Sequence, residues 1–127
     1  MSIIGIGIDL IDIKRFKKLI FRYGIKIPYK ILTERELYEY NHTKNYKEKF
    51  LAKRFTAKEA TAKAMGIGIY QKMFLKNCEV IHNIYGKPKL NIFGYAGKIL
   101  KKLKTKKIFL SITDSKKYMQ SIVILEK

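Results

Sequence analysis

Apolar residues in the first part of the chain follow two different spacings. Ser2–Ile8 is an apolar stretch with glycines at positions 5 and 7, which predicts a strand that another backbone approaches closely. Asp9 follows directly, so we expect the strand to deliver its carboxylate to one end of a sheet. From Leu10 to Tyr23 the apolar residues recur at helical spacing with basic residues between them, until Gly24. This pattern predicts a basic amphipathic helix.

The next part of the chain predicts a loop and two helices. Residues 25–30 contain Pro28 and are expected to form a loop. Thr33 is followed three residues later by Glu36, which is the sequence pattern of a capping box, so a helix is expected over 34–42. The longest helix is predicted over 46–65, because Gly66 stands where a left-handed C-terminal residue is common.

The C-terminal half predicts short strands around one helix. Strands are expected over 79–82 and 89–93, joined by a hairpin connection in which Pro88 cannot occupy a central sheet position. A helix is expected over 94–104, and the strongly alternating segments 107–113 and 118–125 predict a closing antiparallel hairpin. The predicted fold class is therefore α+β, a single small domain over residues 1–127 with an antiparallel sheet packed on a long central helix.

Length and composition limit the class of protein further. The chain has 127 residues, of which 47% are hydrophobic, enough for one modest core. No stretch approaches the roughly 18 consecutive apolar residues of a membrane span, and the N-terminus lacks a signal-peptide pattern, so we expect a soluble, cytoplasmic protein. A single cysteine, Cys78, excludes an internal disulfide and a zinc knuckle, and we expect a buried thiol.

The charge of the chain indicates an acidic partner without choosing its class. Lys and Arg number 28 against 10 Asp and Glu, a net charge of +18 that attracts polyanions. A nucleic acid, an anionic membrane and an acidic protein all fit this charge. Some of the excess reflects a general enrichment in Lys, so charge by itself does not establish a function. The basic helix is first interpreted as a core-packing helix with a solvated face, with a docking helix as the alternative.

The segment 50–66 carries the candidate chemistry. Glu59 stands four residues before Lys63, and such pairs are usually surface ion pairs worth roughly 0.2–0.5 kcal/mol. However, cations and small residues surround Glu59, and a second carboxylate, Asp9, lies upstream. Two carboxylates suit Mg²⁺, which keeps its other positions for water and phosphate oxygens. The pattern predicts chemistry on a phosphate.

Other potential motifs are weaker. The glycine pairs at positions 5/7 and 66/68 complete neither a dinucleotide fingerprint nor a phosphate-binding loop. His42 and His82 have no partner pattern and are expected to be surface or turn residues.

Two longer motifs carry a resemblance to a known family. The first is Gly5-Ile-Gly7-Ile-Asp9-Leu-Ile-Asp-Ile-Lys-Arg15, and the second is Phe50-Leu-Ala-Lys-Arg54-Phe-Thr-Ala-Lys58-Glu59-Ala-Thr-Ala-Lys63-Ala-Met-Gly66. Shorter matches occur over 31–34, 66–69, 86–88 and 110–113. In these motifs and their order, the chain resembles the AcpS-type 4′-phosphopantetheinyl transferases, the holo-[acyl-carrier-protein] synthases, over nearly its whole length.

The resemblance implies a reaction and a cofactor. The reaction is transfer of 4′-phosphopantetheine from coenzyme A to a serine of apo acyl carrier protein, in fatty acid biosynthesis, leaving adenosine 3′,5′-bisphosphate. Mg²⁺ is the implied cofactor, with Asp9 and Glu59 as its ligands. Lys63 would contact the diphosphate or the transferred phosphate. Glu59 is also the candidate general base, and the sequence does not separate the two roles.

The resemblance also implies binding surfaces. Arg15 and Arg22 would contact the acidic carrier protein, so the basic helix becomes a docking surface. Family members form homotrimers with the site between subunits, and neither a nucleic-acid partner nor membrane insertion is implied. The residues implied in coenzyme A binding are Arg54, Lys58, Lys63, Gly66, Gly86, Lys87 and Pro88.

One position departs from many relatives. Asp114 stands where they carry a histidine, and an acid cannot donate to a phosphate as imidazolium does. We therefore assign no role to Asp114. A nucleic-acid-binding module and a membrane-surface protein remain the alternatives, since both would use the basic helices.

Overall fold

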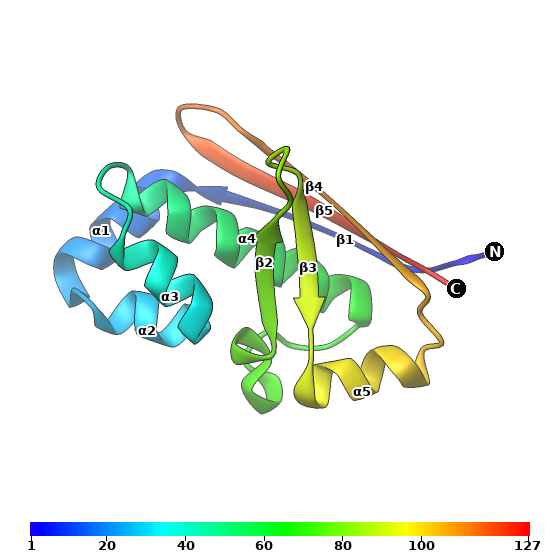
Figure 1. The fold of residues 1–127 in the computed structure, drawn as a ribbon. Coiled ribbons are helices and arrows are strands. Elements are labelled where there is room, and N and C mark those ends of the chain that lie inside the picture. The colour runs from blue at the N-terminus through cyan, green and yellow to red at the C-terminus, as the bar shows by residue number, and fades with distance from the viewer.

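The core of the fold is a long helix packed on a three-stranded sheet. The structure, a computed structural model, describes residues 1–127 apart from the side chains of Lys72 and Met73. Helix α4 (Lys47–Met65) lies along one face of the antiparallel sheet β1-β5-β4 (Figure 1). The strands are β1 (Ile3–Asp12), β4 (Lys107–Asp114) and β5 (Tyr118–Glu126). The predicted antiparallel pairing of β4 with β5 is confirmed.

The remaining elements surround α4. Figure 1 shows three helices gathered at one end of the molecule and a hairpin that crosses α4. The helices are α1 (Ile13–Tyr23), α2 (Lys26–Ile31) and α3 (Glu34–Asn41), and the hairpin is formed by β2 (Cys78–His82) and β3 (Pro88–Ile92). The 3₁₀-helix η1 (Gln71–Lys76) precedes β2, and α5 (Gly94–Lys102) follows β3. In the part of the chain described, no helix is both long and apolar enough to span a bilayer.

Strand β1 packs unusually closely on α4. Its odd-numbered residues from 5 to 11 face the helix, and its even-numbered residues face away. A Cβ placed on Gly7 would stand 1.8 Å from the carbonyl oxygen of Ala60, and one on Gly5 would stand 2.0 Å from that of Ala64. Only glycine permits this approach, so the predicted close contact of a second backbone is confirmed.

The strand β1 is longer than the sequence predicted. It continues to Asp12, because residues 9–12 pair with β5 from Ser121 to Tyr118. Asp9 therefore lies within the strand opposite Ser121, and the prediction that it follows the strand is wrong. Helix α1 begins only at Ile13, where the Asp12 side chain accepts a hydrogen bond from the backbone N–H of Lys14.

Two other predictions need correction. The predicted loop over 25–30 contains α2, in which Pro28 occupies the first turn, where a missing N–H leaves no helix hydrogen bond unmade. The predicted single sheet is two sheets, because β2 and β3 pair only with each other. Pro88 begins β3 opposite His82, consistent with its exclusion from a central strand. The capping box of α3 is confirmed, with Thr33 and Glu36 bonding reciprocally.

Candidate active site

Asp9 and Lys63 meet where β1 crosses α4. The Lys63 Nζ lies 3.3 Å from Asp9 Oδ1 and donates to the backbone oxygen of Ile8 at 3.1 Å. The hydroxyl of Thr56 donates to the other Asp9 oxygen, Oδ2, at 2.8 Å. The Asp9 side chain is 11% exposed and that of Lys63 is 50% exposed. The carboxylate is therefore held on one side by a buried hydroxyl and on the other by a cation that reaches solvent.

Glu59 completes this cluster from the same helix. It lies three residues after Thr56 and four before Lys63, so the three side chains share one face of α4. Burial raises the pKa of the Glu59 carboxyl, and the negative charge of Asp9 raises it further. Lys63 and Arg15 partly offset this rise. The two carboxylates predicted to act together are therefore close enough to influence each other's charge.

The donor set at this cluster fits a divalent cation. Two carboxylates repel each other when both are ionised, and after burial this repulsion is the second cause of the raised pKa of Glu59; a bound cation would relieve it. Within the described residues there is no group of three or more acidic, His or Cys side chains that could enclose a metal. A pair of carboxylates suits Mg²⁺, which binds proteins through one or two carboxylates and completes its shell with water and substrate phosphate.

Helix α1 presents basic residues to solvent, and the first of its arginines acts on this cluster. Arg15 is exposed in the first turn of α1 and acts electrostatically on Glu59 across the contact between α1 and α4. Arg22 is exposed in the last turn, with its guanidinium carbon 5.4 Å from the centre of the Tyr23 ring. Phe21 is 92% exposed between them in sequence. This end of α1 presents cations and an aromatic side chain to solvent.

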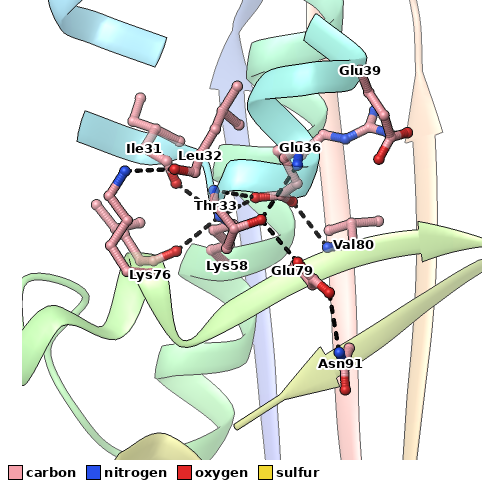
Figure 2. Close-up of polar contacts among 12 residues, drawn as sticks. Ile31, Leu32, Thr33, Glu36, Glu39, Lys58, Lys76, Glu79, Val80 and Asn91 are labelled. Carbon is pink, nitrogen blue, oxygen red and sulfur yellow. Dashed lines mark hydrogen bonds and ion pairs between the residues drawn. The ribbon is translucent and has the colours of Figure 1, made fainter. Parts of the chain in front are cut away.

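Lys58 and Arg54 are placed differently from the sequence prediction. The Lys58 side chain is 0% exposed, and its Nζ donates to Glu36 Oε1 at 2.6 Å and to the backbone oxygens of Ile31 and Leu75 at 2.7 and 2.9 Å. Figure 2 shows the contacts of this residue with Ile31, at the end of α2, and with Glu36 of α3. The assignment of Lys58 to coenzyme A phosphates therefore needs correction: its donors are used inside the core.

Arg54 lies one turn earlier on the same side of α4. Its side chain is 6% exposed, its guanidinium lies 3.7 Å from the centre of the Phe50 ring, and its Nη2 is 3.7 Å from Glu39 Oε2. Burial lowers the pKa of Arg54, and the charges of Glu36 and Glu39 oppose that shift. These contacts tie α4 to α3 and leave little of Arg54 accessible to a ligand.

The remaining residues predicted to bind coenzyme A lie at the end of α4 and in the connection between β2 and β3. Gly66 ends α4 in the left-handed conformation, with φ of 73°. Gly86 and Pro88 line a cavity of about 350 Å³ beside Lys53 and Asp114. Lys87 and Pro88 also line a second cavity of about 420 Å³ against β4. Neither of these two cavities is lined by Asp9 or Glu59.

The histidines, the cysteine and Asp114 have local environments that limit their roles. His42 is exposed at the end of α3, whereas His82 is half-buried near Lys53 and Arg54. Cys78 is a buried free thiol, as expected, and burial raises its pKa to about 12. Asp114 is exposed at the end of β4, and its charge acts on Lys53.

Thr56 was missed by sequence reasoning. It is 0% exposed in α4 and its hydroxyl contacts Asp9, which stands 47 positions earlier. Its spacing of three from Glu59 and seven from Lys63 places it on the same helical face, and this spacing could have identified it. The strand that supplies Asp9 is nonlocal, so the hydrogen bond itself could not be predicted.

Comparison with known proteins identifies the family of the chain. The family model described as the 4′-phosphopantetheinyl transferase superfamily matches residues 5–122. A holo-[acyl-carrier-protein] synthase of Buchnera aphidicola subsp. Cinara cedri is 60% identical over 127 residues, covering 100% of both chains. The crystal structure of holo-[acyl-carrier-protein] synthase from Neisseria meningitidis superimposes with a TM-score of 0.92 at 34% identity, covering 99% of this chain and 100% of that one.

A further structural relative was solved with a ligand. The holo-(acyl-carrier-protein) synthase of Bacillus anthracis, in complex with CoA (3′,5′-ADP), superimposes with a TM-score of 0.82 at 33% identity. The match covers 98% of this chain and 97% of that one. With the family motifs placed on β1 and α4 and matches that extend over the whole fold, the chain belongs to the 4′-phosphopantetheinyl transferase superfamily and to its holo-[acyl-carrier-protein] synthase family.

Proposed function

We propose that Asp9, Glu59 and Lys63 form the catalytic centre with which this enzyme transfers 4′-phosphopantetheine from coenzyme A to a serine of apo acyl carrier protein. The single observation that carries this proposal is the convergence of two carboxylates and one partly exposed ammonium at the crossing of β1 and α4. Glu59 and Lys63 come from one helical face, and the glycines of β1 let Asp9 reach them.

Asp9 and Glu59 are the residues that would hold Mg²⁺. When bound, the ion would neutralise the diphosphate of coenzyme A and make the phosphorus more electrophilic. Lys63 would place its ammonium on a phosphate oxygen, since half of its side chain is exposed. Glu59 would also be the acceptor for the proton of the attacking serine.

The exposed basic side of α1 suits the acidic carrier protein. Arg15 and Arg22 provide cations about two turns apart, and Phe21 adds an apolar contact. Because Arg15 also acts on Glu59, a carrier bound along α1 would bring its serine next to the two carboxylates. Coenzyme A would use Lys63 together with the turn that contains Gly86, Lys87 and Pro88.

A homotrimer would join the two separated parts of the site. The face of the β1-β5-β4 sheet that points away from α4 exposes apolar side chains, which monomers rarely leave in water. Ile6, Ile8 and Leu10 of β1 are 57%, 52% and 58% exposed, and Phe109 is 48% exposed. Packing copies through this face would bring the 86–88 turn of one copy toward the carboxylates of another.

The substrates belong to fatty acid biosynthesis, so we propose that the enzyme acts in the cytoplasm.

The mass of the intact carrier protein tests the transfer. The enzyme is incubated with coenzyme A, Mg²⁺ and apo acyl carrier protein, with and without a chelator. We expect the carrier to gain the mass of one phosphopantetheine only without chelator. A gain that persists with excess chelator would remove the metal assignment, and no gain with several carrier proteins would remove the transfer itself.

Variants separate the proposed roles. Asp9→Asn and Glu59→Gln should abolish the transfer while the fold is retained, and Glu34→Gln, on the exposed first turn of α3, is the matched control. Arg15→Ala should chiefly raise the KM for the carrier protein. Full activity in both carboxylate variants would overturn the assignment of the catalytic centre.

Native mass spectrometry tests the assembly. The parent protein should be trimeric, and Ile8→Glu should produce monomers, because it places a charge on the open apolar face. A parent protein that is monomeric at micromolar concentration would contradict the shared site.

A further inference from the structure

Thr56 has an unusual hydrogen bond for a threonine inside a helix. The hydroxyl of a helical threonine commonly bonds to a carbonyl oxygen one turn earlier in its own helix. Thr61, also 0% exposed in α4, does so, donating to Ala57 O at 2.6 Å. Thr56 instead donates out of the helix to Asp9 on β1. The two buried threonines therefore differ in their hydrogen-bond acceptor: Thr61 bonds within its own helix, and Thr56 bonds to the neighbouring strand.

The hydrogen bond from Thr56 selects one oxygen of Asp9. The hydroxyl lies 2.8 Å from Oδ2 and 3.2 Å from the backbone oxygen of the same residue, and a single proton favours the nearer, charged acceptor. Oδ1 lies 3.3 Å from Lys63 Nζ, whose side chain is half exposed. The partner of Oδ2 is therefore a buried hydroxyl, and the partner of Oδ1 is an ammonium on a side chain that reaches solvent.

We propose that Thr56 is a positioning residue for Mg²⁺: it fixes Oδ2 of Asp9 so that Oδ1 is the oxygen that can exchange its Lys63 partner for the cation. This inference rests on the proposed function of Asp9 as a metal ligand. A hydrogen bond that orients a ligating carboxylate improves its affinity for the metal, and losing such a bond typically weakens metal affinity about 10- to 100-fold.

Direct binding of Mn²⁺, a substitute for Mg²⁺, tests the inference without turnover. The full-length enzyme is titrated in the presence of coenzyme A and without carrier protein, and free Mn²⁺ is measured by electron paramagnetic resonance. Thr56→Val keeps the shape of the side chain and removes the hydroxyl, so we expect its Kd to rise by about tenfold or more. Thr61→Val, which loses a hydroxyl with no contact to Asp9, is the matched control and should bind like the parent.

Thr56→Ser restores the hydroxyl and should recover most of the affinity. The Mg²⁺ concentration that gives half-maximal transfer should shift in the same order among the variants, whereas the KM for the carrier protein should not. Equal Kd values for Thr56→Val and the parent would overturn the inference, whereas the proposal that Asp9 and Glu59 bind the metal would be unaffected. A Thr56→Ser enzyme as weak as Thr56→Val would also overturn it, because the hydroxyl would not be the cause. If the parent itself does not bind Mn²⁺, the proposed metal site fails and the inference falls with it.

Discussion

Replacing Lys58 with methionine should remove a large part of the stability of the fold. Methionine has a similar volume and no charge, so Lys58→Met leaves Glu36 without its ion-pair partner in a site where its side chain is 0% exposed. Two backbone carbonyls, those of Ile31 and Leu75, lose their donor at the same time. Glu36 still accepts hydrogen bonds from the backbone N–H groups of Thr33 and Val80, at 3.0 and 2.9 Å.

The expected magnitude follows from these partners. Removing one member of a buried ion pair costs about 3–5 kcal/mol. The two N–H donors that remain on Glu36 lower the cost, and the two orphaned carbonyls raise it, so we expect about 4 kcal/mol. Domains are stable by only about 5–15 kcal/mol, so this loss is large but measurable.

Urea unfolding monitored by circular dichroism measures the loss at a fixed protomer concentration. Lys101→Met, at an exposed position of α5, is the control and should change the free energy of unfolding by less than about 0.5 kcal/mol. Adding Glu36→Gln to Lys58→Met removes the stranded charge and keeps one carbonyl acceptor. The double variant should therefore lose less than the sum of the two single variants.

The same variant decides between the two roles considered for Lys58. If the residue held coenzyme A phosphates, its loss would raise the KM for coenzyme A by about tenfold or more. The structure instead predicts a folded Lys58→Met enzyme with an almost unchanged KM for coenzyme A, since its ammonium is enclosed. A stability loss below about 1 kcal/mol with a large rise in KM would refute the reasoning.

Two further predictions concern the packing of β1 and the pH dependence of stability. Gly7→Ala should prevent stable folding, because its methyl group would lie 1.8 Å from Ala60 O; thermal unfolding measures this, and a melting temperature within a few degrees of the parent's would contradict it. The pKa of His82 is lowered to about 4, first by burial and then by the charges of Lys53 and Arg54. In the unfolded chain His82 binds a proton as the pH falls through 6.5, whereas in the folded protein it stays neutral until about pH 4. The free energy of unfolding therefore decreases as the pH falls from 6.5 toward 4. His82→Asn should flatten the fall in unfolding free energy between pH 7 and 4.5, and equal slopes would contradict the assignment.

Elements with local signals could be predicted from the sequence. The capping box of Thr33 and Glu36 specifies the start of α3, and Gly66 specifies the end of α4. The β4–β5 hairpin follows from strict alternation. These signals lie within a few residues of the structure they determine, so no tertiary information is needed.

Elements decided by distant partners could not be predicted. Leu10 and Ile11 fit the helical spacing of α1 as well as they fit a strand, and pairing of Leu10 with Gln120 makes them part of β1. The partner of Lys58 lies 22 positions earlier, and charged side chains are rarely buried. The structure brings Asp9, Glu59 and Lys63 together, as the sequence predicted, whereas the burial of Lys58 was not predicted.

Lys58 and Lys63 of the second motif differ because of their direction around α4. Successive residues of a helix are rotated by about 100°, so Thr56, Glu59 and Lys63 fall within about 60° of one another. By the same rotation Lys58 lies about 140° from Lys63. Thr56, Glu59 and Lys63 face β1. Lys58 faces α3 and β2, and its ion pair with Glu36 therefore stabilises the side of α4 that points away from β1. The buried pair thus opposes rotation of α4, and that rotation sets where Glu59 stands relative to Asp9. The motif therefore carries a buried charge that stabilises the position of the helix beside the charges that we propose for the chemistry, and Lys58 shows that a part of the positive charge of the chain lies in the core.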